Sequence, residues 1–316
     1  MKQMKRLGRG LEDFSHLFLS SRSEKGEPLS GTKQDVACKS EGIGKPARAI
    51  CIASDERVGE RVFFTVNLAL EIARQGKRVL VFDADFSLPR LCMLLGFSAR
   101  NSILHFIVRN GEEGIVAEGI DGVKLITLDA DISDLSSLSE GELNSLTRCF
   151  RNAEEEAEIM LINTSPGFIH HMRAILKASS EIIVITPQQV AEMINAYGVI
   201  KTIFQVNRDV HIGIVSSRIS VPVQAEAVFE KMQRVVKKFL HKSLYNYGYL
   251  PEDKEISLSM ARREPLSITS PSSNTIKCIR EISQYVLKMD GCGREKHPVE
   301  ENNFSFFERL FSKSSV

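Results

Sequence analysis

Residues 49–85 read AICIASDERVGERVFFTVNLALEIARQGKRVLVFDAD. Two short apolar runs, 49–53 and 79–82, are typical of buried strands, and the stretch 63–75 between them has helical spacing and ends at Gly76. Strand, helix and strand within about 40 residues predict a βαβ unit with a parallel, right-handed crossover. The polar loop 54–62 precedes the helix, whose free N–H groups and positive dipole end favour a phosphate.

The same alternation continues along the chain. Near-continuous apolar strands separated by helices predict a doubly wound α/β domain over residues 47–288, with a mostly parallel sheet covered on both faces. The further strands are expected at 123–128, 158–162, 182–185, 212–215 and about 244–250, and the further helices at 140–157, 169–179, 190–206, 223–240 and 273–288.

Composition limits the classes of function. The formal net charge is +1 with 26% charged residues, so no global charge argues for nucleic acid or membrane as a partner. Six cysteines without a CxxC pair or zinc spacing fit a reducing cytoplasm. No apolar run has the length of a membrane span, and the start lacks the apolar core of a signal peptide. A Rossmann dehydrogenase is set aside because no G-x-G-x-x-G follows the first strand.

The N-terminal segment is basic and amphipathic over residues 1–20. Its stretch 7–11, L-G-R-G-L, resembles the N-terminal tip of ParB proteins, where a basic residue contacts a ParA-type partner. Arg9 is therefore a candidate partner contact, and a short docking or frayed helix is the alternative. Residues 21–46 have the composition of a flexible linker.

The C-terminal segment 304–316 follows a second polar linker, 289–303. Its apolar side chains share one wide helical face, which predicts an amphipathic membrane-targeting helix. A helix docked back on its own domain is the alternative. The candidate membrane contacts are Phe304, Phe306, Phe307, Leu310 and Phe311.

Two further motifs carry a family resemblance. V-N-L-A at 66–69 and D-A-D at 83–85 flank a loop that aligns without a gap with S-G-K-G-G-V-G-K-T, so the stretch resembles the deviant Walker A unit of the MinD/ParA ATPases. The resemblance implies a P-loop NTPase fold, ATP or ADP with Mg²⁺ as cofactor, and a dimer. It assigns nucleotide binding to Arg57, Gly59, Arg61, Val62, Asp83 and Asn163, metal binding to Asp83 and Asp85, and catalysis to Asp85.

This chain departs from the family pattern at the positions that carry the chemistry. A phosphate cradle needs glycines, a lysine on the phosphates and a hydroxyl on the metal. The family's signature lysine falls on Glu56, three glycines on Arg57, Val58 and Glu60, the phosphate lysine on Arg61, the hydroxyl on Val62 and the Walker B aspartate on Asn163. We therefore predict an inactive or impaired site. The alternative is an atypical ATPase in which Arg61 replaces the lysine while Asp83 and Asp85 hold Mg²⁺.

Segments 131–139, 228–240 and 248–253 are similar to the FlhG/FleN group of flagellar number regulators, and the family's adenine-side asparagine falls on Ser216. This implies a regulator of flagellar number and placement, and cell division or chromosome and plasmid partition is the alternative. The group's D-Q-A-x-x-L-R motif is absent, so action on a partner GTPase is not implied. The expected partners are the membrane surface, a second copy or an intact MinD/ParA-type relative, and other positioning proteins, with no nucleic-acid signal. The expected location is the cytoplasm, at the inner face of the plasma membrane.

Overall fold

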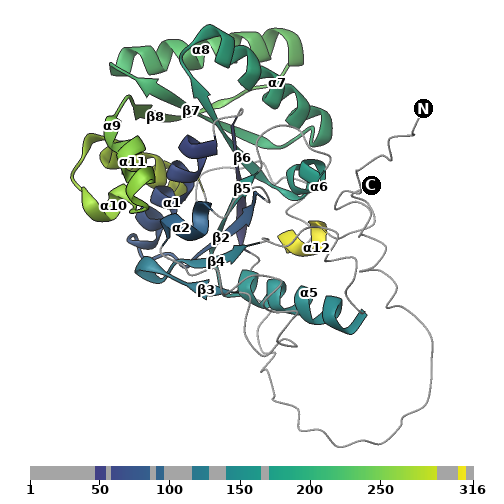
Figure 1. Ribbon diagram of the computed structural model, residues 1–316. Helices are drawn as coiled ribbons and strands as arrows, with labels where there is room; N and C mark the ends of the chain where they lie inside the picture. The colour runs from purple at the N-terminus through teal and green to yellow at the C-terminus, as the bar shows by residue number, and fades with distance from the viewer. Residues whose placement is uncertain are drawn as a thin grey trace, which may run out of the picture.

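A mostly parallel sheet of eight strands runs through the described part of the chain in the order β3-β4-β2-β5-β1-β6-β7-β8 (Figure 1). The computed structural model describes residues 47–54, 58–85, 90–95, 116–127, 140–164, 171–289 and 305–310. Only the pairing of β3 with β4 is antiparallel within these residues. The strands are β1 Arg48–Ala53, β2 Val79–Ala84, β3 Ala117–Glu118, β4 Lys124–Thr127, β5 Ile159–Thr164, β6 Glu181–Pro187, β7 His211–Ile219 and β8 Tyr245–Pro251.

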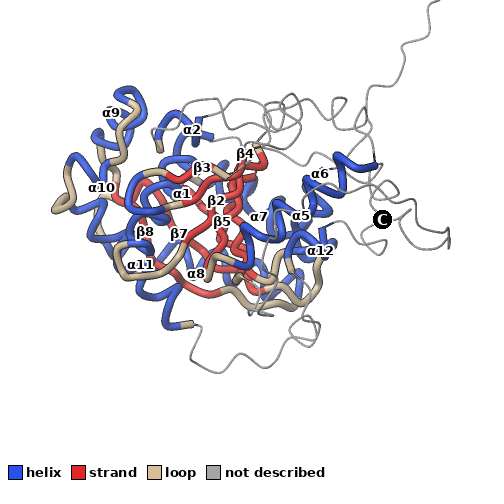
Figure 2. Tube along the Cα trace, turned by 90° about the horizontal axis from the view of Figure 1, so that it is seen from below, coloured by secondary structure: helices blue, strands red, loops and turns tan. Residues whose placement is uncertain are grey.

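Helices cover both faces of the sheet, and Figure 2 shows the strands between the two layers. One layer packs on the face that carries Ile50 and Val81, and it consists of α1 Val58–Ala73, α2 Arg90–Leu94, α9 Lys254–Arg262, α10 Leu266–Thr269 and α11 Asn274–Lys288. The other packs on the face that carries Cys51 and Phe82, and it consists of α5 Glu140–Glu155, α6 His171–Ala178, α7 Val190–Val206, α8 Pro222–Leu240 and α12 Phe306–Leu310. A short 3₁₀ turn, η2 Ile120–Gly122, joins β3 to β4.

The predicted doubly wound α/β architecture is confirmed. Every residue of β2, β5 and β6 is buried, as expected for central strands with helices on both faces. The sequence analysis did not anticipate α2, β3, α9 or α10, which are short or lack a strong apolar period.

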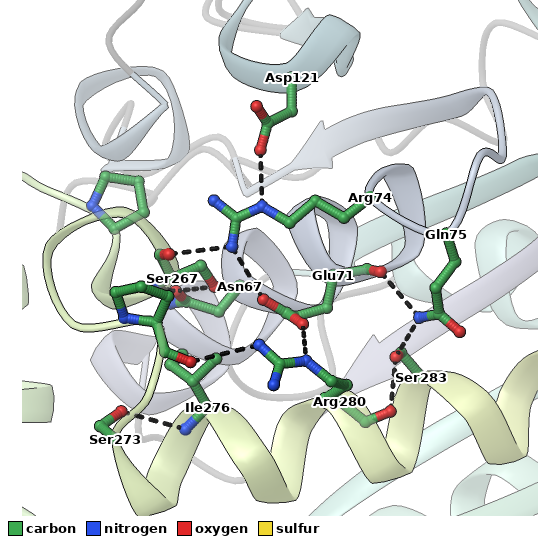
Figure 3. A network of polar contacts seen from close by, with 12 residues as sticks. Asn67, Glu71, Arg74, Gln75, Asp121, Ser267, Ser273, Ile276, Arg280 and Ser283 are labelled. Atoms are coloured by element: carbon green, nitrogen blue, oxygen red, sulfur yellow. Dashed lines mark hydrogen bonds and ion pairs between the residues drawn. The ribbon is translucent and has the colours of Figure 1, made fainter.

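Helix α1 is fixed to α10 and α11 by the polar network of Figure 3. The carboxylate of Glu71, 2% exposed, accepts hydrogen bonds from Arg74 Nη1 at 3.0 Å and from Arg280 Nε at 2.8 Å. The side-chain oxygen of Asn67 accepts from both the backbone N and the Oγ of Ser267, each at 2.8 Å. Because buried polar groups are costly unless paired, this network holds the helix that follows the polar loop in one position.

The C-terminal helix α12 is docked on the domain. Phe306 and Phe307 are 0% and 1% exposed and pack against Phe82 of β2, and Phe307 stacks on Phe150 of α5. The buried carboxylate of Glu154 accepts hydrogen bonds from the backbone N of both phenylalanines, at 2.6 and 3.2 Å.

This docking corrects the expected membrane face. Phe306, Phe307 and Leu310 lie in the core because Phe82 and Phe150 offer them apolar surface, which is the alternative arrangement that the sequence left open. Phe304 and Phe311 lie outside the described residues. None of the described helices combines the length and the apolar character needed to cross a bilayer.

Candidate functional site

The candidate site lies where three neighbouring strands end. Ser54 follows β1, Asp83 and Asp85 stand at the end of β2, and Asn163 is near the end of β5. Strand β5 lies between β1 and β2, and the register pairs Asn163 with Ile52 on one side and with Asp83 on the other. The carboxyl ends of parallel strands therefore bring these side chains to one edge, where open α/β sheets bind their ligands.

Arg61, in the first turn of α1, fills the space between these side chains. Its side chain is fully buried, and each guanidinium nitrogen donates to a different residue. Nε lies 3.0 Å from Asn163 Oδ1, Nη1 3.2 Å from Ser54 Oγ, and Nη2 3.1 Å from Asp85 Oδ2. The planar guanidinium suits this fork of oxygens, so Arg61 and its partners satisfy one another without a ligand.

Burial shapes the charges of the site. It lowers the pKa of the Arg61 guanidinium, while the adjacent carboxylate of Asp85 acts in the opposite direction. Burial also raises the pKa of Asp83 to about 7, against hydrogen bonds from Asn163 Nδ2, at 2.8 Å, and from the backbone N of Asp85. Near neutral pH, both the protonated and the ionised form of Asp83 are therefore populated. Asp85 forms an ion pair with Arg61.

We tested whether these residues fit magnesium and a nucleoside triphosphate. The Arg61 guanidinium donates hydrogen bonds to the side-chain oxygens of Asp85 and Asn163. These oxygens, which would face the metal or its bound waters, are therefore already bound by a cation of the protein itself. Within the described ranges, there is no cluster of three or more His, Cys, Asp or Glu side chains that could hold a metal ion. The side chains present do not fit the Mg²⁺-nucleotide arrangement that the resemblance implies.

Val62 corrects a second expectation. Its side chain, 1% exposed, packs in the core layer between α1 and the sheet, because an apolar side chain at this turn of α1 is stabilised by burial. It does not line the site and has no oxygen for a metal.

The remaining predicted residues are dispersed. Gly59 is exposed at the start of α1, and Ser216 is buried under α8 with its Oγ donating to the carbonyl of Ala225 at 3.4 Å. Arg57 and Arg9 lie outside the described residues. Ser54 was not among the predicted site residues, although its place directly after the first strand puts its hydroxyl within reach of Arg61 in the first turn of α1.

A cleft of about 510 Å³ opens beside the start of α1. Gly59 and Glu60 line it from α1, Gln189 follows β6, and Arg218 lies near the end of β7. The other lining residues are Pro251, Glu252, Asp253, Lys254, Ile256, Ser257 and Met260. A β-bulge near the end of β7 places Arg218 in the left-handed region, with φ 57°. The cleft is large enough for a small polar ligand.

The parallel sheet, with a strand–loop–helix start and two aspartates at the end of β2, defines a protein with the P-loop NTPase fold. A family model described as ParA, NUBPL iron-transfer P-loop NTPase, matches residues 50–287, and the chain belongs to this family.

Curated relatives include two proteins connected with flagella. The antiactivator FleN of Pseudomonas aeruginosa is 21% identical over 273 residues, 86% of this chain and 96% of FleN. The flagellum site-determining protein YlxH of Helicobacter pylori is 24% identical over 248 residues, 78% of this chain and 83% of YlxH.

Solved structures of MinD share the fold. MinD in the MinC:MinD cell division complex of Aquifex aeolicus has a TM-score of 0.60 at 18% identity, covering 79% of this chain and 99% of that chain. MinD of Pyrococcus horikoshii, solved with Mg-ADP, has a TM-score of 0.61 at 18% identity, covering 78% and 98%. The predicted membership of the MinD/ParA family, with similarity to the FlhG/FleN group, is confirmed.

Proposed function

We propose that this protein is a FlhG/FleN-like positioning regulator that acts without hydrolysing ATP. The observation that carries the proposal is the fully buried guanidinium of Arg61, whose nitrogens are bound by Asn163, Ser54 and Asp85. A triphosphate would have to displace this arginine from its partners and leave Asp85 beside the phosphates. Like charges at close range in a buried site make that exchange unfavourable.

The task that the relatives favour is control of flagellar number and placement. FleN and YlxH both carry flagellar names, and both align over most of their own length. Positioning in cell division or in chromosome and plasmid partition is the alternative, which the similarity to MinD supports.

The protein's place in this proposal is the cytoplasm, at the inner face of the plasma membrane. If the C-terminal phenylalanines bind lipid, α12 must first leave its position against Phe82 and Phe150. Its short length makes one copy a weak anchor, and two copies in a dimer would act together. Because the Arg61 site does not favour ATP, a homodimer, or a heterodimer with an intact relative, would need affinity from protein contacts alone.

An atypical ATPase is the second candidate, and the cleft of about 510 Å³ beside Gly59 favours it. On this account a nucleotide base or ribose would enter the cleft while Arg61 turned toward the phosphates. The two candidates differ in whether wild-type protein binds ATP at all.

A grafted site tests the proposal. One variant replaces residues 54–62 by S-G-K-G-G-V-G-K-T and carries Asn163→Asp, and binding of a fluorescent ATP analogue with Mg²⁺ is measured. We expect the graft to gain binding that the wild type lacks, because it restores the cradle and removes the arginine. Binding of the analogue by the wild type, lost in Arg61→Ala, would favour the ATPase instead.

A further inference from the structure

The C-terminal half of α8 carries an exposed face that is both basic and apolar. Phe239 is 61% exposed and Val235 is 37% exposed, whereas most large apolar side chains of the α/β core are buried. Between residues 231 and 240 the helix has no acidic residue. Its four cationic side chains are all exposed, namely Lys231, Arg234, Lys237 and Lys238.

Helical spacing puts these groups side by side. Lys231, Val235 and Phe239 are four residues apart in turn and form one ridge, and Arg234 and Lys238 form the adjacent ridge. The opposite side of α8 is fixed to the sheet by Met232 and Val236, which are buried in the core. The basic and apolar groups are therefore exposed on the side of α8 that faces away from the sheet, and α8 itself lies at the outside of the domain (Figure 1). Lys238 Nζ lies 5.3 Å from the ring centre of Phe239.

None of the four cations forms an ion pair with a described residue, whereas Lys242 just beyond the helix pairs with Asp209 at 3.3 Å. The nearest acids on α8 are Glu226 and Glu230, and Glu230 lies one turn before Arg234 on the same ridge. In a chain with a net charge of only +1, four unpaired cations within eight residues form a strong local field.

We propose that this surface of α8 binds an anionic lipid bilayer. The cations would contact headgroup phosphates, and Phe239 with Val235 would enter the interface, as on basic amphipathic helices that lie at membrane surfaces. The aliphatic Val235 beside Phe239 favours lipid over nucleic acid, whose phosphates give apolar side chains nothing to contact. This goes beyond the proposed function, because it places a membrane contact away from the C-terminal helix and is independent of the Arg61 site.

The test is co-sedimentation of the full chain with vesicles of phosphatidylglycerol and phosphatidylethanolamine, compared with vesicles of phosphatidylcholine alone. The variants are the triple Lys231→Gln, Arg234→Gln, Lys238→Gln and the single Phe239→Ser. The control triple Arg262→Gln, Lys277→Gln, Lys288→Gln removes the same charges from exposed positions on α9 and α11, in the opposite helical layer. Circular dichroism checks that all variants are folded.

We expect the wild type and the control triple to bind the anionic vesicles and not the phosphatidylcholine vesicles. The α8 triple should bind roughly 100-fold more weakly, from the usual contribution of each cation near an anionic surface, and Phe239→Ser should also be weaker. Equal binding by the α8 triple and the wild type would overturn the proposal and place the contact elsewhere, for example on the C-terminal segment. Binding of duplex DNA through these residues, without binding of vesicles, would also overturn it.

Discussion

The protein holds its cations in two contrasting ways. Arg61 is 0% exposed and its three nitrogens are bound by side-chain oxygens of the sheet edge. The four cations of α8 are exposed and form no ion pair within the part of the chain that the structure describes. A buried charge is tolerated only when it is paired, so Arg61 is part of the fold. A solvated charge contributes little to stability, so the α8 cations are available to a partner. The sheet edge at which open α/β folds bind their ligands is therefore occupied here by the protein's own side chain.

The largest expected effect is that of Arg61→Ala. The substitution removes the guanidinium that donates to Asp85 and Asn163 in the buried site, and breaking a buried pair from one side costs about 3–5 kcal/mol of the free energy of unfolding. Urea unfolding measures the change. Arg61→Lys, which keeps one charge but loses the planar fork, should fall between wild type and Ala. Wild-type stability in Arg61→Ala would show that the arginine has no structural role.

Phe307→Ala is expected to have the next largest effect. The ring stacks on Phe150 at 4.9 Å and meets Phe82 edge-on at 5.3 Å between ring centres, so its removal leaves a cavity that costs about 3 kcal/mol. Hydrogen exchange of the α12 amides should become faster at the same time.

Phe239→Ala is the matched control, because this ring is 61% exposed and its loss should change stability by no more than about 0.5 kcal/mol. If the two phenylalanine variants were equally stable, α12 would not be docked in solution as it is in the structure.

A smaller effect concerns pH. The pKa of Asp83 is about 7 in the folded protein, whereas the usual value of 3.8 applies to the unfolded chain. Between pH 3.8 and about pH 7, the folded chain therefore holds a proton on Asp83 that the unfolded chain has lost. The contribution of Asp83 to stability is therefore greatest below about pH 4 and declines as pH rises through about 7. In Asp83→Asn this decline should disappear. Urea unfolding at about pH 5 and about pH 8 compares the two proteins, and identical pH dependence would contradict the raised pKa.

The smallest effect on stability is expected from the α8 triple Lys231→Gln, Arg234→Gln, Lys238→Gln. The three side chains are exposed and unpaired, so the free energy of unfolding should change by no more than about 0.5 kcal/mol. Urea unfolding measures this alongside Arg61→Ala. A large loss of stability in the triple would mean that these cations, like Arg61, serve the fold.

The sequence predicted some of the residues that meet at the candidate site, but it missed Ser54, included Val62, and did not predict what these side chains do there. The family resemblance assigned Asp83, Asp85, Asn163 and Arg61 to one site, and they meet in the structure because β2, β5 and β1 are neighbours and parallel. The Arg61 side chain points into the site because it binds Ser54 and Asn163, and Asn163 is 102 residues away in the sequence. A local sequence pattern cannot predict a contact between residues so far apart. In the sequence, Arg61 in place of the family's lysine and Asn163 in place of the Walker B aspartate are two separate changes. The structure joins them in one hydrogen bond.

The C-terminal segment shows a different limit. An amphipathic pattern predicts that one face will be buried but does not say against what. The partners of Phe306 and Phe307 are Phe82 and Phe150, far away in the sequence, so the pattern and the resemblance favoured a membrane and left the protein's own core as the alternative. Helices α9 and α10 were missed because they are short, and tertiary contacts stabilise them more than local propensity does.

The most direct test of the account is calorimetric titration of purified wild-type protein with ATP and with ADP, each in the presence of Mg²⁺. Because Arg61 satisfies Asn163, Ser54 and Asp85 in the space that the phosphates would need, we predict no heat of binding up to millimolar nucleotide. Micromolar binding that disappears in Arg61→Ala would contradict the account, because it would show that the arginine holds phosphate instead of replacing it.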